Sequence, residues 1–100
     1  MILGKLNNDR LVMELGERRK IGINVFSQNG DNFMLQSVKV SLYRLKKGMV
    51  ELETECDASF DQTNIYTEIE PKTAGFYLLK VEMEIADEQI IKKFNIAVNW

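Results

Sequence analysis

Few residues of this chain could do chemistry, and their types exclude most catalytic mechanisms. The 100 residues contain no histidine and a single cysteine, Cys56. Without a histidine, neither a Ser-His-Asp triad nor a Cys-His pair can form, and zinc would lack its commonest nitrogen ligand. The six glycines are scattered rather than gathered in a phosphate-binding loop. We therefore expect no enzymatic activity and no bound cofactor.

Carboxylates are the remaining candidates for a metal site. Asp57, Asp61 and Asn64 fall in one predicted loop and could offer oxygen ligands to calcium, while Asp87 and Glu88 fall in another. Their spacing matches no dedicated calcium-binding loop. Solvated loop acids are the favoured interpretation, and we predict no metal ion.

Cys56 is predicted to be a small core hydrophobe rather than a reactive thiol. It is in phase with Val50 and Leu52 in an alternating segment, and no histidine base can ionise it. A lone cysteine cannot form an internal disulfide, which favours a reducing compartment. Residues 1–6 are too short an apolar stretch to be a signal peptide. We therefore expect a cytoplasmic protein.

The elements that must position these residues are strands. Apolar and polar residues alternate almost throughout, which is typical of strands with one buried face. The clearest case is the strict alternation over residues 77–85, which a polar break at 86–89 and a second apolar run follow. This pattern predicts two strands joined by a tight turn. Residues 9–20 also allow a helix, although Gly16 favours a strand there. Seven such segments predict an all-β sandwich, with a closed barrel as the alternative.

Composition predicts one soluble globular domain over residues 1–100. The apolar content of 45% and the charged content of 28% are ordinary, and no apolar run is long enough to span a membrane. Residues 1–48 carry nine Lys/Arg and four Asp/Glu, whereas residues 49–100 carry four and eleven. Basic strands lying beside acidic ones would explain this asymmetry. We therefore expect neither a nucleic-acid nor a membrane partner.

The segment Thr73-Ala74-Gly75-Phe76-Tyr77 resembles the tyrosine corner of immunoglobulin-like domains. In that family a tyrosine at the start of the penultimate strand buries its ring, and its hydroxyl bonds to upstream backbone. Here Tyr77 matches that tyrosine and Gly75 permits the bend, while Thr73 stands where the family has an acidic residue. No tryptophan occupies the core of the third strand. The chain therefore resembles a bacterial or phage immunoglobulin-like or fibronectin type III-like domain rather than an antibody domain.

This resemblance implies a seven-stranded antiparallel immunoglobulin-like β-sandwich. Mapped onto this chain, strands A to G would occupy residues 10–15, 19–26, 35–45, 49–56, 63–70, 76–86 and 89–99. Strand C would then lie beside strand F, which would bring Lys39 near the carboxylates of Glu82 and Glu84. Stand-alone modules of this kind are often non-enzymatic accessories of larger assemblies, including phage heads and tails. The resemblance thus implies a structural or protein-binding role and a cytoplasmic or virion-associated location.

Apolar residues out of phase with the alternation identify a candidate interface. If residues 77–85 alternate inward from Tyr77, then Leu78 faces outward, and so do Tyr43 and Ile91 on neighbouring strands. Tyr43, Leu78 and Ile91 would form a contact patch for a protein partner, or for a second copy in a homo-oligomer. A one-residue bulge would instead turn Ile91 inward.

Two other modes of binding remain open. The last strand could pair edge to edge with another chain, unless Lys92 and Lys93 guard that edge. Alternatively, the domain could bind a carbohydrate or another small ligand, which would require exposed aromatic side chains. The available ones are Tyr43, Tyr66, Phe26, Phe33 and Phe60.

Overall fold

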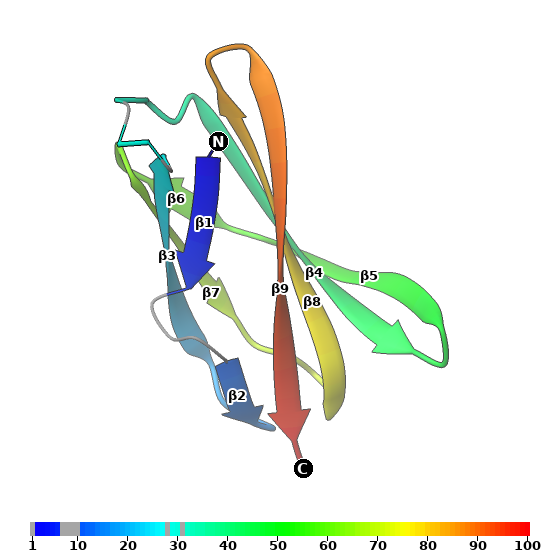
Figure 1. Ribbon diagram of the computed structural model, residues 1–100. Coiled ribbons are helices and arrows are strands. Elements are labelled where there is room, and N and C mark those ends of the chain that lie inside the picture. The colour runs from blue at the N-terminus through cyan, green and yellow to red at the C-terminus, as the bar shows by residue number, and fades with distance from the viewer. Residues whose placement is uncertain (1, 7–10, 28, 31) are drawn as a thin grey trace.

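Nine strands in two facing sheets make up the computed structural model, which describes residues 2–6, 11–27, 29–30 and 32–100 (Figure 1). They are β1 (Ile2–Leu6), β2 (Leu11–Glu14), β3 (Arg19–Ser27), β4 (Ser37–Lys46), β5 (Met49–Cys56), β6 (Ala58–Phe60), β7 (Asn64–Ile69), β8 (Gly75–Ile85) and β9 (Glu88–Asn99). The four-stranded sheet has the order β1-β3-β7-β6 and the five-stranded sheet the order β2-β9-β8-β4-β5. The fold is therefore an all-β sandwich.

The seven predicted segments correspond to strands β2, β3, β4, β5, β7, β8 and β9. Their ends agree with the structure to within two residues, apart from residue 10, which lies outside the described residues. The helix alternative over residues 9–20 is wrong, because β2 and the start of β3 are extended. The prediction of a two-sheet all-β fold is confirmed.

The seven-stranded, fully antiparallel arrangement is wrong in two respects. Strands β1 and β6 were not predicted, because each is short and lacks a run of alternating residues. In addition, β2 runs parallel to β9, while β1 pairs antiparallel with β3 in the other sheet. The chain crosses from one sheet to the other between β1 and β2, and such a crossover allows parallel pairing where a hairpin would not.

The strand at residues 49–56 lies in the five-stranded sheet, as an edge strand beside β4. The family mapping had assigned it to strand D, which lies with strands A, B and E in the seven-stranded arrangement. In this chain the short β6 lies beside β7 instead. The reason is the tight turn at Lys47-Gly48, with φ of 44° and 79°, because two-residue turns of this kind fold β5 back onto β4 as a hairpin.

One apolar core fills the space between the sheets. The inward side chains of β8 are all at most 4% exposed, namely Tyr77, Leu79, Val81, Met83 and Ile85. They belong to the same cluster as buried residues of β2, β3, β4, β7 and β9. Burying a side chain of this size stabilises a fold by about 1.5–3 kcal/mol. The core therefore holds both sheets in place and fixes which side chains face outward.

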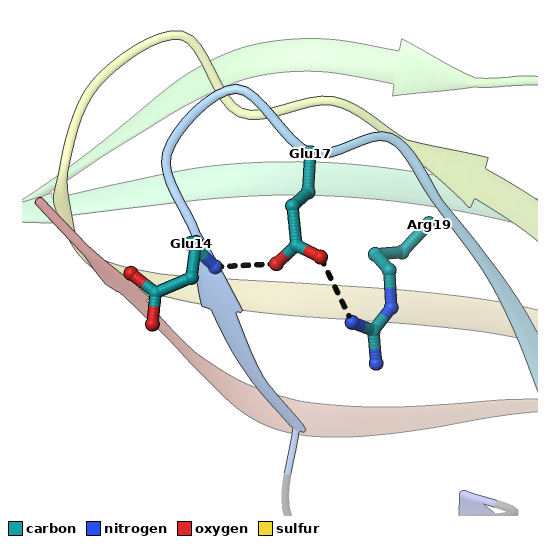
Figure 2. Close-up of polar contacts among 3 residues, drawn as sticks. All are labelled: Glu14, Glu17 and Arg19. Atoms are coloured by element: carbon teal, nitrogen blue, oxygen red, sulfur yellow. Dashed lines mark hydrogen bonds and ion pairs between the residues drawn. The ribbon is translucent and has the colours of Figure 1, made fainter.

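The turn between β2 and β3 carries the chain between the sheets and is closed by one carboxylate (Figure 2). Glu17 Oε1 accepts a hydrogen bond from the backbone N–H of Glu14 at 2.6 Å, and Oε2 accepts one from Arg19 Nη1 at 3.2 Å. The Glu14 amide is the main cause that lowers the pKa of Glu17. The charged carboxylate thus has a structural role in this turn.

Basic residues from the first half of the chain lie beside acidic residues from the second half. Arg18 Nε is 2.7 Å from Glu68 Oε1, and Lys39 Nζ is 3.4 Å from Glu55 Oε1. Lys39 is also the cross-strand partner of Glu82, as predicted. Exposed pairs of this kind stabilise by only ~0–1 kcal/mol each. Their arrangement nevertheless accounts for the uneven charge along the sequence.

Candidate functional site

A tyrosine corner begins β8 and turns one aromatic ring out to solvent. The Tyr77 ring is fully buried, and its hydroxyl donates a hydrogen bond to the Thr73 carbonyl oxygen at 2.7 Å. Gly75 has a φ of 139°, which residues with a side chain rarely adopt. Because Tyr77 points inward, the next residue back, Phe76, points outward and is 68% exposed.

Phe76 is the centre of a line of apolar side chains across the outer face of the five-stranded sheet. In sheet order from β2 to β5 the line consists of Val12, Ala97, Phe76, Leu45 and Val50, each the cross-strand partner of the next. Cross-strand partners share a face, and strands lie ~4.8 Å apart, so the line extends over roughly 19 Å. Four of its members are between 36% and 68% exposed.

A second, shorter line runs beside the first. Tyr43 on β4 is the partner of Leu78 on β8 and of Leu52 on β5. Leu52 is 54% exposed, while Tyr43 and Leu78 are half-buried. A recess of about 160 Å³ lies beside Phe76, with Leu45 and Ala97 among its lining residues. We call the eight residues of the two lines the apolar face: Val12, Tyr43, Leu45, Val50, Leu52, Phe76, Leu78 and Ala97.

A β-bulge in β5 puts the two β5 residues of the apolar face out of phase with the residues that follow them. Leu42 pairs with Thr54 but the next residue, Tyr43, pairs with Leu52, so Glu53 is an extra residue in β5. An extra residue reverses the side-chain alternation beyond it. The predicted common phase of Val50 and Leu52 with Cys56 is therefore wrong, because the bulge separates them.

Cys56 packs half-buried against the core, beyond the bulge. Burial is the main cause that raises the pKa of its thiol. The bulged Glu53 lies near the core, with Oε1 3.4 Å from the Tyr77 hydroxyl. The bulge thus also connects β5 to the tyrosine corner.

Charged side chains end the apolar face toward the β8–β9 turn. Lys80 and Lys93 are cross-strand partners on the same outer side of the sheet, next to the apolar face. Lys80 Nζ lies 3.0 Å from Glu82 Oε1 and 5.9 Å from the centre of the Tyr43 ring. The hydrogen bond to Glu82 raises the pKa of Lys80. The face therefore has an apolar centre and a charged border.

Ile91 lies beyond that border. It is 48% exposed and pairs with Glu82, four residues along β9 from the partner of Leu78. At ~3.3 Å per residue this is about 13 Å from the level of Leu78. Of the three residues predicted as an interface, the structure brings Tyr43 and Leu78 into contact range and places Ile91 apart.

Sequence reasoning missed the most exposed members of the apolar face. Val12, Leu45 and Phe76 are out of phase with buried neighbours in their own strands, which is the same signal that identified Leu78. Val50 and Leu52 gave no such signal, because the bulge at Glu53 that puts them out of phase with Cys56 is not visible in the sequence. Pairing register was the missing information.

Two of the candidate calcium ligands, Asp61 and Asn64, are hydrogen-bonded to each other in the turn between β6 and β7. Asp61 Oδ1 accepts hydrogen bonds from the backbone N–H groups of Thr63 and Asn64, at 3.0 and 2.8 Å. These bonds lower the pKa of Asp61. Within the described ranges, no three His, Cys, Asp or Glu side chains are grouped as metal ligands.

The edge of β9 is partly covered. Strand β2 pairs with residues 96–99. The half-buried Lys92 packs close to Gly4 of β1, because a Cβ added at Gly4 would lie 3.4 Å from the Lys92 Cγ.

In the part of the chain that the structure describes, there is no helix long and apolar enough to cross a bilayer.

Comparisons with known proteins identify a fold and not a family. No family model matches the chain, and no curated protein matches it. An engineered protein of known structure superposes on all of the chain with a TM-score of 0.71 and 14% identity, using 20% of its own length. The endo-β-1,4-mannanase from Thermotoga petrophila superposes on all of the chain with a TM-score of 0.62 and 10% identity, and the match covers 20% of the mannanase chain.

Domains 4 and 5 of the S-layer protein SbsC also match. They give a TM-score of 0.59 and 13% identity over 98% of this chain and 45% of theirs. The chain thus spans from a fifth to under half of these three structures. At such low identities the likeness shows the fold alone, an all-β sandwich-like domain.

Proposed function

We propose that this chain is a non-enzymatic module that binds another protein, or a second copy of itself, through the apolar face. The observation that carries this proposal is the cross-strand line centred on Phe76. Four of its side chains, together with Leu52, are 36–68% exposed. Phe76, Leu45 and Val50 are direct neighbours, and Ala97 connects Phe76 to Val12. Side chains exposed to this extent leave on the order of 400 Å² of contiguous apolar surface, as large as the largest patch of a typical monomer.

The composition of the face fits a protein interface. Typical interfaces bury ~800 Å² on each partner and combine an apolar centre with a polar rim. Phe76, Leu45 and Val50 supply the centre, while Lys80 and Lys93 supply part of the rim. An aromatic ring that stands out beside a recess is a common anchor for a partner.

The immunoglobulin-like type of sandwich is part of the proposal. With β1, β3, β7 and β6 as strands A, B, E and D, the four-stranded sheet has the order A-B-E-D. With β9, β8, β4 and β5 as G, F, C and C′, the other sheet has the order G-F-C-C′, as in variable-type domains, and β2 lies beside G. The hydrogen bond from the Tyr77 hydroxyl to the Thr73 carbonyl supports the same assignment.

We further propose that the module is a small structural component of a phage or prophage particle, on the basis of the resemblance. The gene should then lie among head or tail genes, and its product should be present in purified particles. A gene flanked only by metabolic genes, with no product in particles, would contradict this part of the proposal.

The binding role can be tested with two charged substitutions at matched exposure. Phe76→Asp changes the centre of the apolar face, and Met34→Asp changes a loop residue of similar exposure, 64% against 68%. Light scattering coupled to size-exclusion chromatography, from micromolar to millimolar concentration, measures self-association. Affinity capture from the natural host with each variant, quantified by mass spectrometry, measures binding to other proteins.

We expect Phe76→Asp to abolish either the concentration-dependent increase in mass or the capture of a specific protein. Met34→Asp should leave both unchanged. Ile91→Asp should also have little effect, because Ile91 lies beyond the charged border. A chain that stays monomeric, and whose captured proteins are the same for wild type and Phe76→Asp, would contradict the proposal.

A further inference from the structure

The outer face of the other, four-stranded sheet contains a recess that is independent of the apolar face. It lies where β3, β7 and β6 run side by side, and its volume is about 460 Å³. This is within the ~300–1,000 Å³ typical of small-molecule sites. Gly22 forms part of its floor, at an outward position between the buried Ile21 and Ile23. The missing side chain at Gly22 helps to make the recess.

Tyr66 forms an aromatic wall of this recess. It is 47% exposed, and its cross-strand partners on the two sides are Gly22 and Ser59, both too small to cover the ring. The Tyr66 hydroxyl donates a hydrogen bond to Asp61 Oδ2 at 3.3 Å. Because backbone N–H groups hold Asp61 in turn, the ring is oriented before any ligand binds. Such preorganisation reduces the entropy lost on binding.

Polar groups converge on the same recess. Glu68 lies beside its partner Lys20 at the next outward position, and Asp57 and Ser59 line the side formed by β6. Arg18 Nε holds Glu68 Oε1 at 2.7 Å, which orients that carboxylate. Carboxylates accept strong hydrogen bonds from hydroxyl groups. The recess therefore offers an aromatic surface with hydrogen-bond acceptors around it.

This chemistry discriminates among ligand classes. Single-stranded nucleic acid needs a positively charged groove beside the aromatic platform. Among the side chains that the structure describes here, three carboxylates (Asp57, Asp61 and Glu68) face two cations (Lys20 and Arg18). A peptide that adds as a strand pairs along a free sheet edge. Strands β3 and β7, which form the floor of the recess, are each paired on both sides, and the free edge is that of β6, at the side of the recess. A neutral ligand with one apolar face and a rim of hydroxyls fits both constraints.

We propose that this recess binds a neutral sugar unit of an oligosaccharide, which stacks on Tyr66 and donates hydroxyl hydrogen bonds to Glu68 and Asp57. The site is shallow and open, so the affinity should be weak for a single sugar and should rise with chain length. This role does not depend on the apolar face, which belongs to the opposite sheet.

The test is an NMR titration of the full chain with cellohexaose, mannohexaose and chitohexaose as probes. Amide shifts at Gly22, Ser59 and Tyr66 report the recess, and those at Phe76 report the apolar face. We expect at least one hexaose to shift the recess signals alone. Tyr66→Ala should weaken binding about tenfold, the equivalent of one aromatic contact, and Tyr66→Phe only a few-fold, because the ring remains.

Gly22→Val provides a second variant that fills the recess without removing any polar group, and should abolish binding. Phe60→Ala is the control, because Phe60 is an exposed aromatic residue on the same sheet that does not line the recess. Three results would each overturn the proposal: no recess shifts with any hexaose, unchanged binding by Tyr66→Ala, or tighter binding of a sulfated than of a neutral oligosaccharide. None of them bears on the apolar face.

Discussion

The β8–β9 and β4–β5 hairpins are built alike but place their apolar residues differently. Both close with a two-residue turn in which both residues have positive φ, Ala86-Asp87 in one and Lys47-Gly48 in the other. In β8 the alternating residues from Tyr77 to Ile85 are buried in the core. In β5, by contrast, Val50 and Leu52 lie on the outer face. Val50 and Leu52 face outward because they pair with the outward Leu45 and Tyr43. The extra residue Glu53 then returns Cys56 to the side of the core. Alternation shows that a strand has two faces, and register decides which face is buried.

The largest expected effect is the difference in free energy of unfolding between the same Leu→Ala substitution in the two hairpins. Leu79→Ala in β8 removes a fully buried side chain and should lower the free energy of unfolding by about 2–5 kcal/mol. Leu52→Ala in β5 removes a 54% exposed side chain and should change it by less than about 0.5 kcal/mol. Urea denaturation of both variants gives the two values. Equal losses would mean that Leu52 is buried in solution and that the assigned register of β5 is wrong.

The next effect concerns the corner that begins β8. Tyr77→Phe keeps the buried ring but removes the hydroxyl that bonds to Thr73 and lies near Glu53. The Thr73 carbonyl and Glu53 then lose a partner, so the free energy of unfolding should fall by about 1–3 kcal/mol. Thermal and urea denaturation measure this loss. A variant as stable as wild type would show that the corner contributes no stability.

The two turns should respond in opposite directions. Ala86 and Asp87 have φ of 49° and 67°, in the left-handed region that costs energy in Ala and less in Asp, and that Gly and Asn adopt most readily. The pair Ala86→Asn with Asp87→Gly should therefore stabilise the fold by about 1 kcal/mol. Gly48→Ala, at a φ of 79°, should destabilise it by about as much. Denaturation midpoints test both changes, and the same sign for both would contradict the assigned turn geometry.

The smallest effect lies outside both hairpins, in the turn that Glu17 closes. The pKa of Glu17 in the folded state is below the ordinary 4.5. The stability that its charge contributes is therefore present above about pH 4.5 and is lost as the pH falls through the folded-state pKa. Glu17→Gln should be less stable than wild type at neutral pH, and the gap should close in acid. A gap that is constant with pH would exclude a role for the charge.

The sequence was sufficient for the fold class and for seven of the strands, because alternating apolar residues and turn residues are local signals. It was insufficient for β1 and β6, which are too short to show a pattern, and for the parallel pairing of β2 with β9. The tyrosine corner was visible in the local segment around Gly75 and Tyr77. The apolar face was not, because three strands must be placed in register before Phe76, Leu45 and Val50 become neighbours.

The central claim is that the apolar face contacts another protein, and site-specific photo-crosslinking in the natural host tests it most directly. A photoreactive phenylalanine analogue replaces either Phe76 on the apolar face or Phe60 on the opposite sheet, which is the control. We predict that position 76 forms one discrete adduct, whose mass identifies a second copy or another protein, and that Val50→Asp removes it. Adducts at position 60 but none at position 76 would contradict the claim.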